Sequence, residues 1–226
     1  GQYLRTFLPE RDWSYHDFRD SHIHDFLEMA EYLTKKGLVV IRMGKVMQQK
    51  FETNNAMIID YANSSLRSDF ADVYLFANCF FCISTSTGMD ALASIFRRPI
   101  GLVNVVNIKS VALGESFKLF QPKRFFDISL ERDLNYEEIM KRSLFSASES
   151  SQFIANNISL KDNSPEELRL FASEFLGVLG ESNAKQLKNV DSSLKLDYLR
   201  ASQARIAKIS QSWLNRYPEY LDSSSL

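Results

Sequence analysis

Apolar residues in the first part of the chain recur at two different periods. From Ile23 to Leu33 they return every three or four positions, which predicts a helix, and Ser21 is placed to cap its start. We expect this helix to end at Lys35-Lys36-Gly37, because cations suit a last turn and glycine tolerates a positive φ. The continuous apolar run 38–41 then predicts a strand that is buried on both faces.

The same alternation continues to about residue 130. Ser68 is placed to cap a helix over 69–78, and another helix is expected over 88–97. Strands that alternate with helices form βαβ units, so the predicted fold class is α/β, with a doubly wound parallel sheet. Antiparallel hairpins are not expected, because the chain holds eight glycines and no Asn-Gly or Asp-Gly dipeptide. The further predicted strands are 56–59, 80–83, 100–103 and, more weakly, 125–128.

Helical signals dominate after residue 130. Asn135 and Glu138 have the spacing of a capping box, and Ser164-Pro165-Glu166-Glu167 is a stronger helix start with proline at the first helical position. Apolar side chains at helical spacing over 168–176 would form the buried stripe of that helix. The remaining predictions are a polar loop at 181–193, a last helix at 194–214 that ends before Pro218, and a frayed tail at 222–226.

Composition narrows the class of protein. The 226 residues are 45% hydrophobic and 24% charged, which is typical of a globular chain that buries a core without disulfides or metals. The formal net charge is −1, so the chain has no global basic excess with which to bind nucleic acid. The two cysteines suit a reducing compartment, and we expect Cys79 and Cys82 to be structural thiols.

The stretch with the most chemistry is a turn between a predicted strand and a predicted helix. It carries four hydroxyl residues and a glycine, Ser84, Thr85, Ser86, Thr87 and Gly88. Backbone N–H groups at a helix start can bind a phosphate, and ligands bind at the carboxyl ends of the strands in open α/β sheets.

The alternative for this turn is purely local. Thr87 and Asp90 would form a capping box, and Gly88 would only relieve crowding. The Asp90 carboxylate would also repel an anion unless it faces a sugar hydroxyl.

Other polar residues follow the neighbouring predicted strands. Parallel strands would bring their ends to the same edge as the hydroxyl-rich turn, where Arg and Lys suit a diphosphate. The alternatives are solvated loops for Arg42 and Lys45 and a surface ion pair for Arg67. The residues concerned are Arg42, Gly44 and Lys45 after one strand, Asp60 and Tyr61 after the next, and Arg67 and Ser68 before a helix.

Taken together, several of these motifs resemble a known family. In this order they are Ser14 to Asp20, Val40 to Gly44, Ile59 to Ala62, Leu66 to Phe70, and Ser84 to Asp90 followed by Phe96 to Ile100. The chain is similar over nearly its whole length to a family assigned as bacterial glycosyltransferases and found with surface-polysaccharide biosynthesis.

The resemblance implies a GT-B-like architecture, in which two Rossmann-type domains face each other across a cleft. This chain would be the C-terminal, donor-binding half. Residues 1–160 would form the Rossmann-like nucleotide-sugar-binding domain, and 161–226 a helical extension that packs on it or on a missing N-terminal domain. The implied location is cytoplasmic, with peripheral contact to the inner membrane face as an alternative.

A more distant likeness is to bacterial heptosyltransferases, whose donor motif reads Asp-Ser/Thr-Gly-x-x-His at the same turn. Thr87 and Gly88 match this motif, whereas Ser86 stands in place of the aspartate and Ala91 in place of the histidine. The phosphate-binding backbone can therefore carry over, but the roles of that aspartate and histidine cannot.

The chain's three histidines do not have the spacing of a metal site. His16, Asp17 and Arg19 belong to the family motif, which implies that Arg19 borders the cleft, as would Asp60 and Tyr61. His16 and Asp17 are the candidate catalytic residues, with Asp17 as general base. The alternative is a hydrogen-bonded loop cluster.

The function that these observations predict is metal-independent transfer of a sugar from a nucleotide sugar to a glycan or lipid-linked acceptor. No cofactor is expected, and no Asp-x-Asp motif occurs. Expected partners are the nucleotide sugar, the acceptor, and an N-terminal domain or a homodimer partner, but no nucleic acid. The alternatives are a sugar-nucleotide epimerase on the same scaffold and a non-catalytic nucleotide-sugar-binding module.

Overall fold

The central sheet consists of four parallel strands. The computed structural model describes residues 2–45, 47, 49–111, 118–187 and 208–221. The strand order is β3 (Cys82–Ser84), β4 (Ile100–Val105), β5 (Lys118–Pro122) and β9 (Lys208–Ile209). A further parallel pair is formed by β1 (Val40–Ile41) and β2 (Ile58–Ile59).

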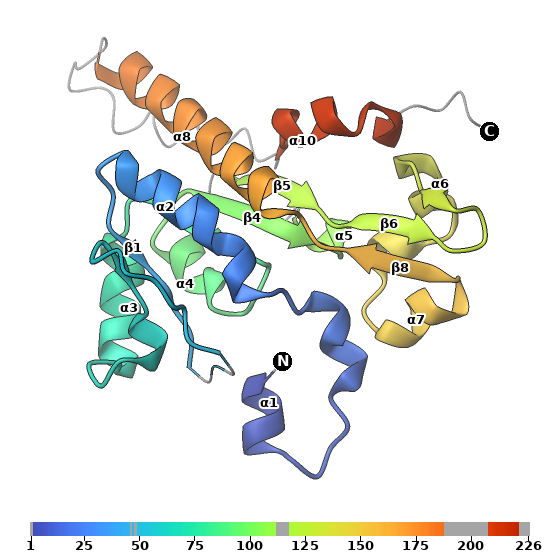
Figure 1. Ribbon diagram of the computed structural model, residues 1–226, viewed down its shortest axis with the longest axis horizontal. Helices are drawn as coiled ribbons and strands as arrows, with labels where there is room; N and C mark the ends of the chain where they lie inside the picture. The colour runs from blue at the N-terminus through green and yellow to red at the C-terminus, as the bar shows by residue number, and fades with distance from the viewer. Residues whose placement is uncertain (1, 46, 48, 112–117, 188–207, 222–226) are drawn as a thin grey trace.

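Helices cover both faces of this sheet (Figure 1). On one face, α2 (Leu27–Lys35) and α8 (Pro165–Leu187) pack with Val103 and Leu119 in one apolar cluster. On the other face, α3 (Asp69–Asn78) and α4 (Asp90–Ile95) pack with Ile100 and Leu102 in a second cluster, and α5 (Ile108–Val111) joins them. The described chain is therefore a mixed α/β protein built on parallel strands.

Helix α8 lies very close to β4 because Gly101 has no side chain. A Cβ at Gly101 would lie only 2.7 Å from Cε1 of Phe171, which is fully buried. All six residues of β4 are buried. The strand therefore forms the middle of the core between the two helical layers.

A second, antiparallel sheet corrects the expectation that hairpins are absent. Its strand order is β7 (Arg132–Asp133), β6 (Arg124–Asp127) and β8 (Ile158–Lys161). The turn between β6 and β7 needs no glycine, because Asp127 Oδ1 accepts hydrogen bonds from the N–H groups of Ser129 and Leu130. Glu131 then adopts a positive φ of 53°.

Several local predictions are confirmed. Ser68 Oγ accepts from the Ala71 N–H at the start of α3, and Gly37 ends α2 with a φ of 84°. Asn135 and Glu138 form the capping box of α6 (Tyr136–Lys141). Ser164 accepts from the N–H of Glu167, whose carboxylate accepts from the N–H of Ser164. Each of these signals involves residues within three or four positions of one another.

Other boundaries differ from the predictions. The helix expected from Ile23 begins as a 3₁₀ turn, η2 (Ile23–Phe26), and Ser21 accepts a hydrogen bond from Asn104 Nδ2 instead of capping it. The strand expected at 80–83 is Cys82–Ser84, and the helix expected at 88–97 is Asp90–Ile95. Strand β1, which was expected to be buried on both faces, is only partly buried.

The C-terminal predictions were partly wrong. Helix α8 continues to Leu187, so 181–187 is not a loop, and residues 208–209 form the edge strand β9 instead of helix. Among the described residues of the predicted last helix, 211–214 are helical and belong to α10 (Gln211–Arg216). Residues 188–207 and the expected frayed tail at 222–226 lie outside the described residues. The remaining described elements are α1 (Gln2–Phe7), α7 (Ser150–Ala155) and the 3₁₀ turns η1 (Ser14–Arg19), η3 (Tyr61–Asn63), η4 (Leu144–Ser146) and η5 (Pro218–Leu221).

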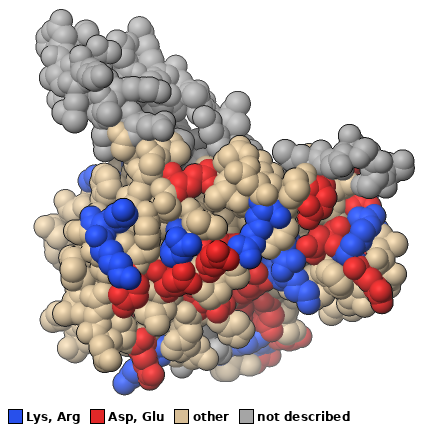
Figure 2. Space-filling model, turned by 45° about the horizontal axis from the view of Figure 1, so that its top comes forward, with Lys and Arg blue, Asp and Glu red and all other residues tan. Residues whose placement is uncertain are grey.

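Helix α10 is attached to α8 by carboxylates. Glu174 accepts hydrogen bonds from the Ser210 hydroxyl and from the N–H groups of Gln211 and Ser212. The Arg216–Glu166 ion pair also joins the two helices. Figure 2 shows positive and negative side chains interspersed over the described part of the surface in that view. Within the described residues, no helix is long and apolar enough to cross a membrane.

Two buried asparagines tie the end of β4 to the start of α8. The N–H of Asn104 donates to Asn163 Oδ1 at 2.8 Å, and the N–H of Asn163 donates to Asn104 Oδ1 at 2.6 Å. Asn163 Nδ2 also donates to the Pro122 carbonyl of β5. Both side chains are only 2% exposed, so removing either amide would leave buried backbone groups without a partner.

We expect the substitution Asn163→Ala to lower the free energy of unfolding by about 2–4 kcal/mol, because the two buried hydrogen bonds of the Asn163 side chain are lost and the Asn104 N–H and the Pro122 carbonyl lose a partner. Asn156→Ala is the matched control, because the Asn156 amide bonds only to the Gln152 carbonyl on the exposed surface of α7. Urea unfolding followed by circular dichroism measures both variants. Equal stability losses in the two variants would contradict this account of the asparagine pair.

Candidate functional site

The hydroxyl-rich turn directly follows β3, at the carboxyl end of a parallel strand. Thr87 and Gly88 are exposed, and a Cβ placed on Gly88 would meet no atom within 4 Å. Ser86 adopts a positive φ of 58°. The turn is therefore open to a ligand.

The turn also has unused hydrogen-bond donors. Within the described part of the chain, no hydrogen bond engages the backbone N–H groups of Ser86, Gly88 or Met89. The Gly88 and Met89 N–H groups are successive, whereas the Thr87 N–H between Ser86 and Gly88 donates to Ser84 Oγ. Free N–H groups close to a left-handed residue can bind an anion. This supports the phosphate interpretation of the turn, but not by itself a particular ligand.

The local alternative, a Thr87–Asp90 capping box, is wrong. Met89 is the N-cap of α4, and no side chain caps that helix. The Asp90 carboxylate instead accepts a hydrogen bond from Ser84 Oγ at 3.1 Å, while Ser84 Oγ accepts one from the Thr87 N–H at 3.4 Å. Ser84 thus connects Asp90 to the turn and fixes the direction of its carboxylate.

Arg42 lies at the end of β1, and its guanidinium already has partners within the chain. Its Nη1 donates to the Gln49 carbonyl at 2.7 Å and lies 3.4 Å from both carboxylate oxygens of Asp60. Asp60 also accepts from the Phe51 N–H and from Asn63 Nδ2. The Arg42 side chain is only 11% exposed. This pair therefore holds the long loop between β1 and β2 in place.

Arg67 also connects two segments of the chain. Its Nε donates to the Gly44 carbonyl at 3.0 Å, and its Nη2 lies 2.6 Å from the buried carboxylate of Asp72. The expectation of a surface ion pair is met only by the weaker contact to Asp69. Asp72 lies in the first turn of α3. No sequence signal marked it as the buried partner of Arg67.

The remaining residues of this edge are held within the same loops. Lys45 is half-exposed and lies 3.6 Å from Asp69. The hydroxyl of the buried Tyr61 donates to the Ser68 carbonyl and accepts from its N–H. Tyr61 and Ser68 therefore support the start of α3, and Lys45 is the most exposed cation among the predicted binding residues.

Side-chain packing links these loops. Val40 of β1 and Ile83 of β3 belong to one apolar cluster. Met43, just beyond β1, and Met89, just beyond β3, belong to another. The Gly44 carbonyl, next to Met43, accepts a hydrogen bond from Arg67, so the Arg42 and Arg67 loops are both connected to the region of the hydroxyl-rich turn. Figure 1 shows β1, α3 and α4 as neighbours.

The candidate catalytic residues lie on a different part of the chain, in η1. Asp17 forms a bidentate ion pair with Arg5, at 2.6 and 2.7 Å. Phe18, the neighbour of His16, is buried in the cluster that also holds Phe153 of α7. Arg19 lies over the Phe18 ring. This arrangement agrees with the hydrogen-bonded loop cluster, and the catalytic roles stay predictions.

The protonation of His16 follows from its surroundings. Burial, helped by the nearby Arg19, lowers the pKa of His16 below its usual 6.5, and its Nδ1 is buried without a hydrogen-bond partner. The imidazole stacks on Tyr15 with ring centroids 4.0 Å apart. His16 is therefore neutral at pH 7.

Burial disfavours protonation of His16 only in the folded state. The free energy of unfolding therefore falls as the pH drops through 6.5 toward the lowered pKa of the folded state. We expect an NMR titration of the His16 ring protons to give a midpoint below 6.5. We also expect His16→Asn to lose less stability than wild type between pH 7.5 and 5. A His16 midpoint above 6.5 would contradict the buried, neutral imidazole.

Neither cysteine pairs in the structure. Cys79 and Cys82 are free thiols, and burial raises the pKa of Cys82 to about 12. This agrees with structural thiols that are not reactive. Among the described residues, no group of three or more histidine, cysteine or acidic side chains could hold a metal ion.

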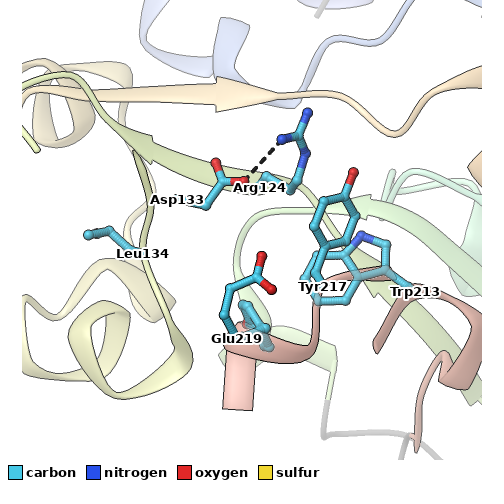
Figure 3. A pocket seen from close by; sticks show the side chains of 7 residues that line it. Arg124, Asp133, Leu134, Trp213, Tyr217 and Glu219 are labelled. Carbon is cyan, nitrogen blue, oxygen red and sulfur yellow. Dashed lines mark hydrogen bonds and ion pairs between the residues drawn. The ribbon is translucent and has the colours of Figure 1, made fainter. Parts of the chain in front are cut away.

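A separate small pocket lies between β6, β7 and the C-terminal helices, and sequence reasoning did not find it (Figure 3). Arg124 reaches Asp133 at 3.0 Å and lies over the Tyr217 ring, which packs on Trp213. The pocket has a volume of about 10 Å³, which is room for one water molecule.

Two aromatic residues of this pocket belong to the chain's own core. Trp213 and Tyr220 are 2% and 5% exposed and pack with Phe125 and Leu134. Burial raises the pKa of Tyr217 to about 12.

Comparison with known proteins identifies no relative. No family model matches the chain, and neither a curated protein nor a solved structure is similar to it. The resemblance to bacterial glycosyltransferases therefore stays a prediction.

Proposed function

We propose that the chain binds the diphosphate of a nucleotide sugar at the turn after β3 and takes part in transfer of the sugar to a glycan or lipid-linked acceptor. One observation carries the proposal. The turn is exposed, has free backbone N–H groups at Ser86, Gly88 and Met89, and lies at the carboxyl end of a parallel strand. Rossmann-like sheets bind nucleotides at such positions.

The proposed chemistry uses the main chain. When the acceptor hydroxyl attacks the anomeric carbon, the bond to the diphosphate breaks and the leaving group gains negative charge. Preorganised N–H donors stabilise such developing charge without rearranging. In this proposal the diphosphate is neutralised without a metal, and Lys45 is the half-exposed cation among the predicted binding residues.

Arg42 and Arg67 have an indirect role in this proposal. Both side chains are mostly buried and paired, Arg42 with Asp60 and Arg67 with Asp72. They fix the loops beside the turn and so set its shape. Asp90, held by Ser84, is placed to accept a hydrogen bond from a sugar hydroxyl instead of meeting a phosphate.

A non-catalytic nucleotide-sugar-binding module is the second candidate. The observation that favours it is the Asp17–Arg5 ion pair, because a general base must be free to receive a proton from the acceptor. A doubly wound, GT-B-like arrangement with a facing domain would supply the acceptor side that the transfer reaction needs.

The donor-binding proposal is tested with a thermal-shift panel of UDP, GDP, CMP and dTDP sugars. A ligand at about 100 times its dissociation constant should stabilise the chain by about 2.7 kcal/mol. We expect one nucleotide class to raise the melting temperature, and no response to any of them would overturn the proposal. Release of free nucleoside diphosphate with an added acceptor would then separate transfer from simple binding.

A substitution in the turn tests the site itself. Gly88→Asp should weaken binding of the responding nucleotide about tenfold or more, because it adds a negative charge where the diphosphate would lie and meets no steric obstacle. Gly177→Asp is the matched control, since this exposed glycine on α8 is also free of neighbours within 4 Å. Equal affinities for both variants, measured by calorimetry, would place the nucleotide elsewhere.

A further inference from the structure

The outer face of α3 is unusually apolar for an exposed helix. Within α3 only Asp69 and Asp72 are charged, and Asp72 is turned inward to Arg67. A helix that is apolar on nearly all sides is normally covered by other protein. The exposed side chains Leu66, Phe70, Val73, Tyr74, Ile95 and Phe96 form what we call the α3 face.

These side chains lie on two elements that pack against each other. Phe70 and Tyr74 are one helical turn apart and stack with ring centroids 6.2 Å apart. The adjoining α4 packs against α3, and Arg98 donates to the Ala77 carbonyl near the end of α3. Ile95 and Phe96 directly precede this Arg98 contact in the chain and add exposed apolar side chains at the end of α4.

The exposed area is large enough for a stable interface. Leu66 and Phe70 are 79% and 78% exposed, Ile95 is 69% and Tyr74 is 57%. If an aromatic side chain has roughly 150–250 Å² and an aliphatic one somewhat less, the α3 face exposes on the order of 600–700 Å². This approaches the ~800 Å² that each partner buries in a standard protein interface, and it exceeds the apolar patches of most monomers.

Charges at the two ends of α3 indicate what covers it. Asp69 lies at the start of the helix and stays 82% exposed although it also contacts Lys45 and Arg67, whereas the exposed Arg97 directly precedes Arg98, which contacts the end of α3. If two copies pack with their α3 helices antiparallel, Asp69 of each copy comes opposite Arg97 of the other. The net charge of −1 does not oppose this association.

We propose that the α3 face is the contact of a two-fold symmetric homodimer in which antiparallel α3 helices pack and Asp69 pairs with Arg97 across the axis. The aromatic stack of Phe70 and Tyr74 lies at the centre, and the charged pairs form the rim. A self-complementary surface of this kind is what a two-fold interface requires. The dimer does not depend on the proposed function, because the face lies outside the turn after β3.

Sedimentation equilibrium over about 1–200 μM tests the dimer. We expect a mass near twice 26.0 kDa for wild type and near 26.0 kDa for Phe70→Asp at the same concentrations. Ile154→Asp is the matched control, since Ile154 is 74% exposed on α7, away from the α3 face. It should leave the mass unchanged, and a thermal melt confirms that each variant is folded.

A charge exchange tests the antiparallel pairing. Asp69→Lys and Arg97→Asp should each weaken dimerisation about fivefold or more, and the double variant should recover most of the loss. A wild-type chain that is monomeric at 200 μM would overturn the proposal. A dimer that persists in the Phe70→Asp variant would also overturn it. If the double charge variant dimerises more weakly than both single variants, the antiparallel arrangement is wrong.

Discussion

The rest of the structure depends on the close contact between β4 and α8. Because Gly101 has no side chain, Phe171 of α8 can pack directly on β4, a strand whose every residue is buried. A parallel strand buried on both faces requires helices on both sides of the sheet. The asparagine pair then fixes the end of β4 to the start of α8. Together these contacts set where the strands end, and thus where a ligand can bind.

At the edge where the strands end, the charged side chains pair with one another. Two of the arginines expected to bind a diphosphate are instead paired with Asp60 and Asp72, because a mostly buried guanidinium without a partner would be costly. Each pair fixes a loop beside the turn after β3. What this edge offers a ligand is therefore mainly its backbone N–H groups, whose position depends on those loops.

The sequence predicted the features that depend on near neighbours. The caps at Ser68, Asn135 and Ser164 and the end of α2 at Gly37 each need only a few consecutive residues, and all four are present. The hairpin of β6 and β7 was missed because Asp127 and Glu131 do the work usually done by a glycine. The edge strand β9 was missed because its short, polar sequence pairs only where β5 offers a free edge.

The amino-acid sequence by itself determined the order of helices and strands from α2 to β4, the presence of parallel strands with helices between them, and the hydroxyl-rich turn after a strand. Periodicity and local caps carry that information along the chain. Only the tertiary structure decided that Arg42 and Arg67 are paired, that Trp213 and Tyr220 are buried in the chain's own core, and that the outer face of α3 is uncovered. Those facts depend on contacts between distant segments, which no local pattern records.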